Sequence, residues 1–192
     1  AEDYASHEET VARLIPLLER ETGPATVVGF SLGAQLAVLL AARRPDLVAD
    51  AVVISAQAEP LRAVRPTLAL LRLTAGLARN ERFARLQARE LFIPDALLPR
   101  YLETSAALSR TTLLRAVEEN LRFAPPSAWS THPGSALVLV GGDEKPLMHR
   151  SAALLNRVHP HSTLEVLRGC GHGVPLQQPV ELAARLQERL PG

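Results

Sequence analysis

One stretch decides how this chain folds: residues 25–33, whose sequence is ATVVGFSLG. It opens with a β-branched run, which is the composition of a buried strand. Residues 34–44 then predict a helix that ends at Pro45 and Asp46. Ser31 therefore stands on a tight turn between a strand and a helix, with a glycine two residues away on each side.

That arrangement, Gly-Phe-Ser-Leu-Gly, matches the nucleophile-elbow pattern G-x-S-x-G. Because the turn strains the serine backbone, we expect that residues 29 and 33 cannot carry bulky side chains against it. The hydroxyl would project above the sheet edge, where the helix N-terminus favours developing negative charge. The Leu32 backbone N–H is then a candidate oxyanion donor. The alternative is a glycine-containing connection with an incidental serine, which the strand before and the helix after disfavour.

The composition is that of one globular domain: 192 residues, of which 47% are hydrophobic and 21% charged. A formal net charge of +1 argues against a nucleic-acid-binding protein that relies on phosphate contacts. No run of about 18 apolar residues occurs, so no integral membrane segment is expected. The single cysteine excludes an internal disulfide and favours a cytoplasmic location, although an exported enzyme without disulfides would have the same composition.

Predicted strands and helices alternate along the chain, except in its middle. Strands are predicted at 50–55, 136–140 and 163–167, and helices at 2–21, 146–158 and 180–190. This alternation predicts an α/β fold with a mostly parallel sheet and helices on both faces. Right-handed crossovers bring the carboxyl ends of parallel strands to one edge. Ser31, the 141–144 turn and the 169–173 turn should therefore meet at that edge.

Residues 57–130 interrupt the alternation with helical patterns alone, at 68–77, 81–91, 94–104 and 109–123. We interpret this insert as a helical lid subdomain over the site, joined to a core formed by 1–56 and 131–192. The insert carries 11 arginines against 7 carboxylates. A solvated arginine-rich face explains this excess better than an acidic ligand or a membrane surface does.

A serine becomes a nucleophile when a base removes its proton, and an acceptor must orient that base. His172 is the candidate base, because it alone among the six histidines lies in a glycine-rich turn after a strand, GCGHG at 169–173. The alternative is a loop histidine bonded to the backbone. Cys170 in the same turn is expected to be a small buried packing residue rather than a second nucleophile. The other histidines are predicted to be surface residues: His7, His132, His149, His159 and His161.

The orienting acid has three candidates. The turn after the 136–140 strand offers two adjacent carboxylates, Asp143 and Glu144, and either could accept a hydrogen bond from an imidazole Nδ1–H. Glu59, just past the 50–55 strand, is the third. We favour Glu144, then Asp143, then Glu59. The alternative is that both turn carboxylates are solvated and that Lys145 pairs with one of them.

Along the chain the order is serine, acid, histidine, which is the α/β-hydrolase order among the known triad orders. The chain resembles a lidded member of the α/β-hydrolase superfamily in three segments: VVGFSLG at 27–33, VLVGGDEK at 138–145, and GCGHG followed by VPLQQP at 169–179. In that family the acid usually stands three residues after the first glycine of its turn. Glu144 occupies this position here, in place of the usual aspartate.

The resemblance also implies several strands before the elbow strand, and an earlier loop that donates the second oxyanion N–H. Only 30 residues precede Ser31, so we expect a chain that lacks these N-terminal strands. The elbow strand would then be an edge strand with an apolar, unpaired side. The second oxyanion donor would come from outside this chain, and self-association into a homo-oligomer would be favoured.

The sequence thus predicts a serine hydrolase of esterase type, with Ser31 as nucleophile, His172 as base, and Glu144 or Asp143 as acid. The substrate would be a small molecule with an apolar acyl or alkyl group, and no metal or organic cofactor is implied. One alternative is a non-catalytic binding protein that keeps the pocket. Another is a C–C bond hydrolase, a lyase or a cofactor-free oxidase, because the fold alone does not determine the reaction.

Overall fold

A parallel sheet of four strands forms the centre of the molecule. The computed structural model describes residues 4–61, 63–74 and 80–188. Each strand pairs with the next in the chain, and all pairs are parallel. The predicted α/β fold is confirmed. The strands are β1 (Ala25–Phe30), β2 (Val48–Ile54), β3 (Ser135–Gly141) and β4 (Ser162–Leu167).

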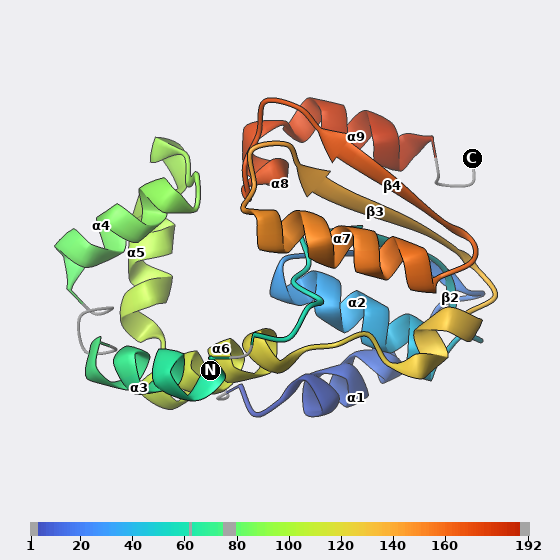
Figure 1. The fold of residues 1–192 in the computed structure, drawn as a ribbon, viewed down its shortest axis with the longest axis horizontal. Helices are drawn as coiled ribbons and strands as arrows, with labels where there is room; N and C mark the ends of the chain where they lie inside the picture. Colours follow the sequence, from blue (N-terminus) through green and yellow to red (C-terminus); the bar gives the residue numbers. More distant parts are fainter. Residues whose placement is uncertain (1–3, 62, 75–79, 189–192) are drawn as a thin grey trace.

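Helices cover both faces of this sheet (Figure 1). Side chains alternate along β2, so that Val53 belongs to one core cluster while Val52 and Ile54 belong to the other. The first cluster is completed by α1 (His7–Leu18), α2 (Leu32–Arg43) and α7 (Pro146–Val158), and the second by α8 (Val174–Gln177) and α9 (Pro179–Gln187). The apolar character of α2 on nearly every side follows from its burial between the sheet and its neighbours.

Among the described residues of the insert, the regular secondary structure is helical, with loops between the helices. Its helices are α3 (Val64–Thr74), α4 (Glu81–Glu90), α5 (Leu98–Ala107) and α6 (Arg110–Arg122), with 3-10 turns η2 (Asp95–Leu97) and η3 (Ser127–Thr131). The helix predicted at 68–77 begins earlier, and its last three residues lie outside the described residues. The arrowheads of β3 and β4 point toward α4 and α5 (Figure 1), so the insert lies at the carboxyl edge of the sheet. Its division from the core as a lid subdomain stays a prediction.

The turn after β1 has the geometry that the elbow pattern predicts. The Ser31 N–H donates to the Ile54 carbonyl at 2.8 Å, which extends the β1–β2 ladder by one residue. Ser31 then adopts φ 54° and ψ −118°, a conformation that side-chain-bearing residues rarely adopt. A Cβ on Gly29 would lie 2.2 Å from the Gly33 carbonyl oxygen, so the turn requires glycine at 29. A Cβ on Gly33 would meet no atom within 4 Å, so sterics give no reason for glycine at 33.

The prediction that five histidines lie at the surface is wrong for His7, His132 and His159, which are buried. His7 Nε2 lies 2.8 Å from Gln35 Oε1. The rings of His132 and His159 pack against Trp129. Proline next to His132 and His159 indicated exposed loops, but both rings pack against Trp129 of η3 and have polar partners in the interior.

The buried rings of His132 and His159 are joined in a chain of hydrogen bonds. His159 Nε2 lies 3.3 Å from His132 Nδ1, and His132 Nε2 lies 3.0 Å from the Val48 carbonyl oxygen. The His161 N–H donates to His159 Nδ1 at 3.2 Å. Each imidazole therefore donates through Nε2 and accepts through Nδ1. Burial, followed by the proximity of His132 and His161, lowers the pKa of His159 to about 4.

β1 is the edge strand of the described sheet, as expected from the resemblance. Its Val28 is half exposed. Val28 lines an apolar groove with residues of α1 and α2, among them Leu14, Leu17 and Leu36. Within the described residues, no helix has the length and apolar character needed to cross a membrane.

The two glycines of the elbow give a matched pair of substitutions. Gly29→Ala should lower the free energy of unfolding by about 2 kcal/mol or more, because its Cβ would collide with backbone atoms of residues 33 and 34. Gly33→Ala should leave it unchanged or raise it by up to about 1 kcal/mol, because alanine is the better helix former. Denaturant unfolding of both variants measures this, and equal losses in the two would contradict the geometry.

His159 predicts an acid-sensitive contribution to stability. Its pKa is lower in the folded protein than its ordinary value, so the unfolded chain binds an extra proton below about pH 6.5. The free energy of unfolding of the wild type should therefore fall relative to that of His159→Gln between about pH 6.5 and pH 4, by roughly 1–3 kcal/mol. Urea unfolding at several pH values measures the difference. A difference that stays constant over this range would contradict the prediction.

Candidate active site

Three chain segments meet at the carboxyl edge of the sheet: the turn after β1, the turn after β3 and the loop after β4. They carry Ser31, Glu144 and His172, respectively. In each pair of strands, one more backbone hydrogen bond forms beyond the end of the first strand before the chain turns away. The donors are the N–H groups of Ser31, Ser55 and Gly142, and the acceptors are the carbonyl oxygens of Ile54, Leu139 and Leu167, respectively. The strands thus fix where each turn starts.

The structure brings together the three residues that the sequence favoured. His172 Nε2 lies 3.0 Å from Ser31 Oγ, and His172 Nδ1 lies 2.9 Å from Glu144 Oε2. Because the carboxylate accepts at Nδ1–H, the ring has Nε2 free to accept the serine hydroxyl proton. The phenyl ring of Phe30 lies 5.3 Å from the imidazole, centre to centre, and limits how the imidazole can tilt.

Both oxygens of the buried Glu144 carboxylate are hydrogen-bonded. Oε2 accepts from His172, while Oε1 accepts from Ser55 Oγ at 2.6 Å and from the Gly141 N–H at 3.0 Å. Burial by itself would raise the pKa of Glu144, but the hydrogen bonds from His172, Ser55 and Gly141 outweigh it and hold the pKa below its usual value. Glu144 is therefore a carboxylate at neutral pH.

Ser55 was not among the site residues predicted from the sequence. It follows β2 directly and adopts φ 53°, like Ser31 after β1, and this turn directs its hydroxyl to Glu144. The sequence held one signal for this role. Ser55 ends the strand predicted at 50–55, and the next predicted strand, 136–140, precedes Glu144. A polar residue there was certain to lie on the same edge as the site.

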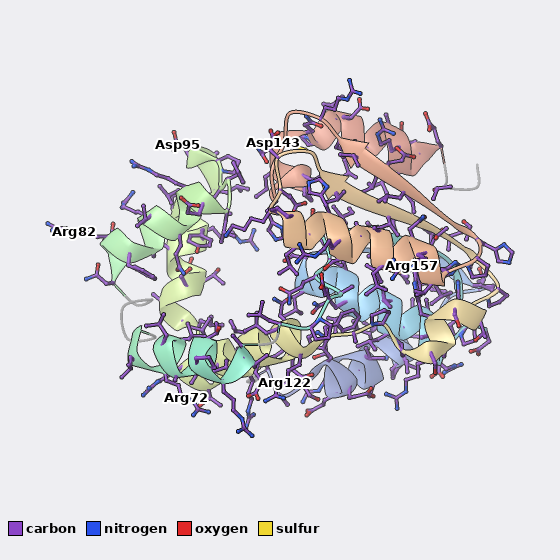
Figure 2. The ribbon with its side chains drawn as sticks, in the orientation of Figure 1. Arg72, Arg82, Asp95, Arg122, Asp143 and Arg157 are labelled. Atoms are coloured by element: carbon purple, nitrogen blue, oxygen red, sulfur yellow. The ribbon has the colours of Figure 1, made fainter. Side chains whose placement is uncertain are left out.

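The two other candidate acids lie elsewhere. Asp143 is exposed, and Figure 2 shows it on the side of the core that faces the insert. Glu59 pairs with Arg150 at 2.7 Å. No ion pair of Lys145 with either turn carboxylate occurs among the described residues.

Leu32 and Cys170 lie where the sequence placed them. Leu32 is the first residue of α2, where backbone N–H groups have no acceptor within the helix, so its N–H is available beside Ser31. Cys170 is buried, and its thiol donates to the Leu167 carbonyl. Burial raises the pKa of this thiol, which disfavours the reactive thiolate.

A pocket of about 520 Å³ opens beside His172 and Glu144. Its apolar wall comes from both parts of the molecule: Leu91 and Phe92 from the insert, and Leu147 and Met148 from α7. Asp143 and Lys145 lie at its exposed rim. In the part of the chain that the structure describes, no group of three His, Cys, Asp or Glu side chains could hold a metal ion.

Solved structures with this fold include proteins with different stated activities. MenH from S. aureus superposes with a TM-score of 0.77 at 13% identity, over 98% of this chain and 78% of its own. A carboxylesterase from Nitrososphaera gargenis superposes with a TM-score of 0.75 at 20% identity, over 96% of this chain and 71% of its own. A meta-cleavage product hydrolase from Pseudomonas fluorescens superposes with a TM-score of 0.74 at 19% identity, over 98% of this chain and 73% of its own. At these identities the likeness is one of fold.

Sequence comparison assigns the family. No curated protein matches the sequence significantly. A family model described as the alpha/beta hydrolase family matches residues 1–185, which is nearly the whole chain. The match includes the elbow after β1 and the turns that carry Glu144 and His172. The chain therefore belongs to the alpha/beta hydrolase family.

Proposed function

We propose that this protein is a serine hydrolase that cleaves a carboxylic ester or a related acyl substrate. The observation that supports this best is the hydrogen-bonded series Ser31 Oγ, His172 Nε2, His172 Nδ1 and Glu144 Oε2, with separations of 3.0 and 2.9 Å. A nucleophile, a base within hydrogen-bonding distance and an acceptor that orients the base are the parts that acyl transfer through serine needs.

In the proposed reaction, Ser31 Oγ attacks the substrate carbonyl while His172 Nε2 takes its proton. The imidazolium that forms keeps its Nδ1–H on the ionised Glu144, which stabilises the positive charge. The Leu32 N–H donates to the developing oxyanion, aided by the N-terminus of α2. His172 then protonates the leaving group, and a water molecule that it activates in turn releases the acyl group from Ser31.

The pocket supports a substrate with an apolar acyl or alkyl group. Leu91, Phe92, Leu147 and Met148 offer apolar contacts beside His172. Since two of these side chains belong to the insert, we propose that the insert acts as a lid, and that substrate binding excludes water from the site.

A C–C bond hydrolase is the second candidate. The Pseudomonas fluorescens neighbour is named for cleaving a meta-cleavage product, and a Ser-His-acid site can serve that reaction as well. Product analysis on a panel of esters and diketones separates the two. A ligand that binds and is never converted would favour a non-catalytic binding protein instead.

Ser31→Ala tests the nucleophile. It should lower kcat on an activated ester by about 10³-fold or more, because no other described hydroxyl lies within hydrogen-bonding distance of His172. It should also abolish labelling by a fluorophosphonate probe, which the wild type should carry on Ser31. Ser130→Ala, which changes an exposed serine far from the site, is the matched control. Full turnover by Ser31→Ala would rule out the proposed nucleophile.

The neighbouring carboxylates Glu144 and Asp143 form a matched pair that tests the acid. Glu144→Gln should lower kcat by roughly 10³–10⁴-fold, because an amide does not stabilise the imidazolium and favours the wrong imidazole tautomer. Asp143→Asn should change kcat by less than about threefold, since its side chain is exposed and makes no described contact with His172. Steady-state kinetics on one ester compares them. The reverse order of effects would identify Asp143 as the acid.

A further inference from the structure

Helix α4 of the insert ends in a Schellman motif with an unusual residue in it. The Ile93 N–H donates to the Ala88 carbonyl at 2.9 Å, and the Phe92 N–H to the Arg89 carbonyl at 3.0 Å. Phe92 thereby occupies the left-handed position of the motif, at φ 58°. Glycine is usual at this position because a side chain strains the backbone there. A phenylalanine in a strained conformation indicates that its side chain is needed in that place.

The Phe92 ring lies across the loop that carries His172. A Cβ added to Gly173 would lie 2.8 Å from Phe92 Cβ and 2.9 Å from its Cδ2. A Cβ added to Gly171 would lie 3.0 Å from Cζ at the far end of the ring. The Phe92 side chain therefore lies against both glycines that flank His172, and a side chain at either position would crowd it, more severely at 173 than at 171.

The opposite side of the same loop is held by the core. A Cβ on Gly141 would lie 2.3 Å from the Gly171 carbonyl oxygen, so the loop rests directly on the end of β3. The Asp143 N–H donates to the Cys170 carbonyl at 3.0 Å, and Gln177 Oε1 accepts from the Gly171 N–H at 2.9 Å. The backbone around His172 is thus enclosed between the core and one side chain of the insert.

We infer that Phe92 is a positioning residue for the base of the proposed serine hydrolase: it clamps the 171–173 segment against the end of β3 and so holds His172 between Ser31 and Glu144. The inference rests on the proposed function. Through this contact, the insert that covers the pocket also sets the geometry of the base. Movement of α4 away from the core would release the 171–173 segment. The position of the proposed lid would then determine whether His172 is held in place.

Three substitutions of Phe92 separate the effect of losing the ring from the effect of the strained backbone. Phe92→Gly removes the ring and relieves the strain, Phe92→Ala removes the ring and keeps the strain, and Phe92→Leu keeps the part of the side chain that contacts Gly173. The readouts are kcat and KM on an acetyl and a hexanoyl ester, the rate of fluorophosphonate labelling of Ser31, and the melting temperature.

If Phe92 positions His172, the glycine and alanine variants lose kcat by roughly 10- to 100-fold on both esters, with KM changed less than threefold. Labelling of Ser31 slows by the same factor. Phe92→Leu has a kcat between those of Phe92→Ala and the wild type. Phe92→Gly loses as much kcat as Phe92→Ala, although its melting temperature is no lower. A loss confined to KM on the hexanoyl ester would make Phe92 a pocket wall alone and overturn the inference.

Wild-type kinetics in all three glycine, alanine and leucine variants would also overturn it. Failure of the proposed function gives a different result. In that case the wild type itself carries no label on Ser31 and hydrolyses neither ester, whatever residue stands at 92. Should Phe92→Gly fail to fold, the graded comparison of Phe92→Leu with the wild type still decides, since a positioning role requires a lower kcat at unchanged KM.

Discussion

The Glu144 carboxylate is the group on which the geometry of the candidate site depends most. A buried charge is costly unless it is hydrogen-bonded, and here Ser55 Oγ, the Gly141 N–H and His172 share that task. Since two of these donors belong to the ends of β2 and β3, the carboxylate is fixed to the sheet. It can then impose one tautomer and one orientation on His172, which a carboxylate on a mobile loop could not do.

The sheet register explains why three distant segments meet with this accuracy. Each ladder extends one residue beyond its strand, and the next residue turns away from the sheet. Ser31 and Ser55 hold strained backbone conformations at the ends of adjacent strands, so both hydroxyls point along the same edge. On their strand side, the Ser31 and Ser55 N–H groups are held by ladder hydrogen bonds to Ile54 and Leu139, and α2 begins directly after Ser31.

Much of this arrangement could be predicted from the sequence. Alternating strands and helices predicted the fold class. The elbow pattern, together with the rule that parallel strands end at one edge, selected Ser31 and His172. For the acid the sequence left Glu144, Asp143 and Glu59 open, with Glu144 favoured. Ser55 and Phe92 were missed because their importance comes from a turn conformation and a tertiary contact, neither of which has a periodic signature. The burial of His132 and His159 was missed for the same reason, since flanking prolines indicate a loop but not what covers it.

The glycines near Ser31 and His172 also show what the sequence could not predict. The elbow pattern treats residues 29 and 33 alike, yet the structure requires glycine at 29 alone. Conversely, the sequence gives no sign that Gly171 and Gly173 lie against Phe92, which follows the end of α4 and would crowd a side chain at either position. Local motifs thus pointed to Ser31, Glu144 and His172 of the candidate site, whereas the contacts made by Ser55 and Phe92 depend on long-range packing.

The proposed function requires one central claim, that Ser31 carries the acyl group during turnover. Intact-protein mass spectrometry of the protein, acid-quenched while it hydrolyses p-nitrophenyl butyrate, tests this claim directly. A transient mass increase of one butyryl group is expected, which peptide mapping locates on Ser31 and which disappears when the substrate is exhausted. Turnover without any adduct, or with the butyryl group on Cys170 or another residue, would contradict it.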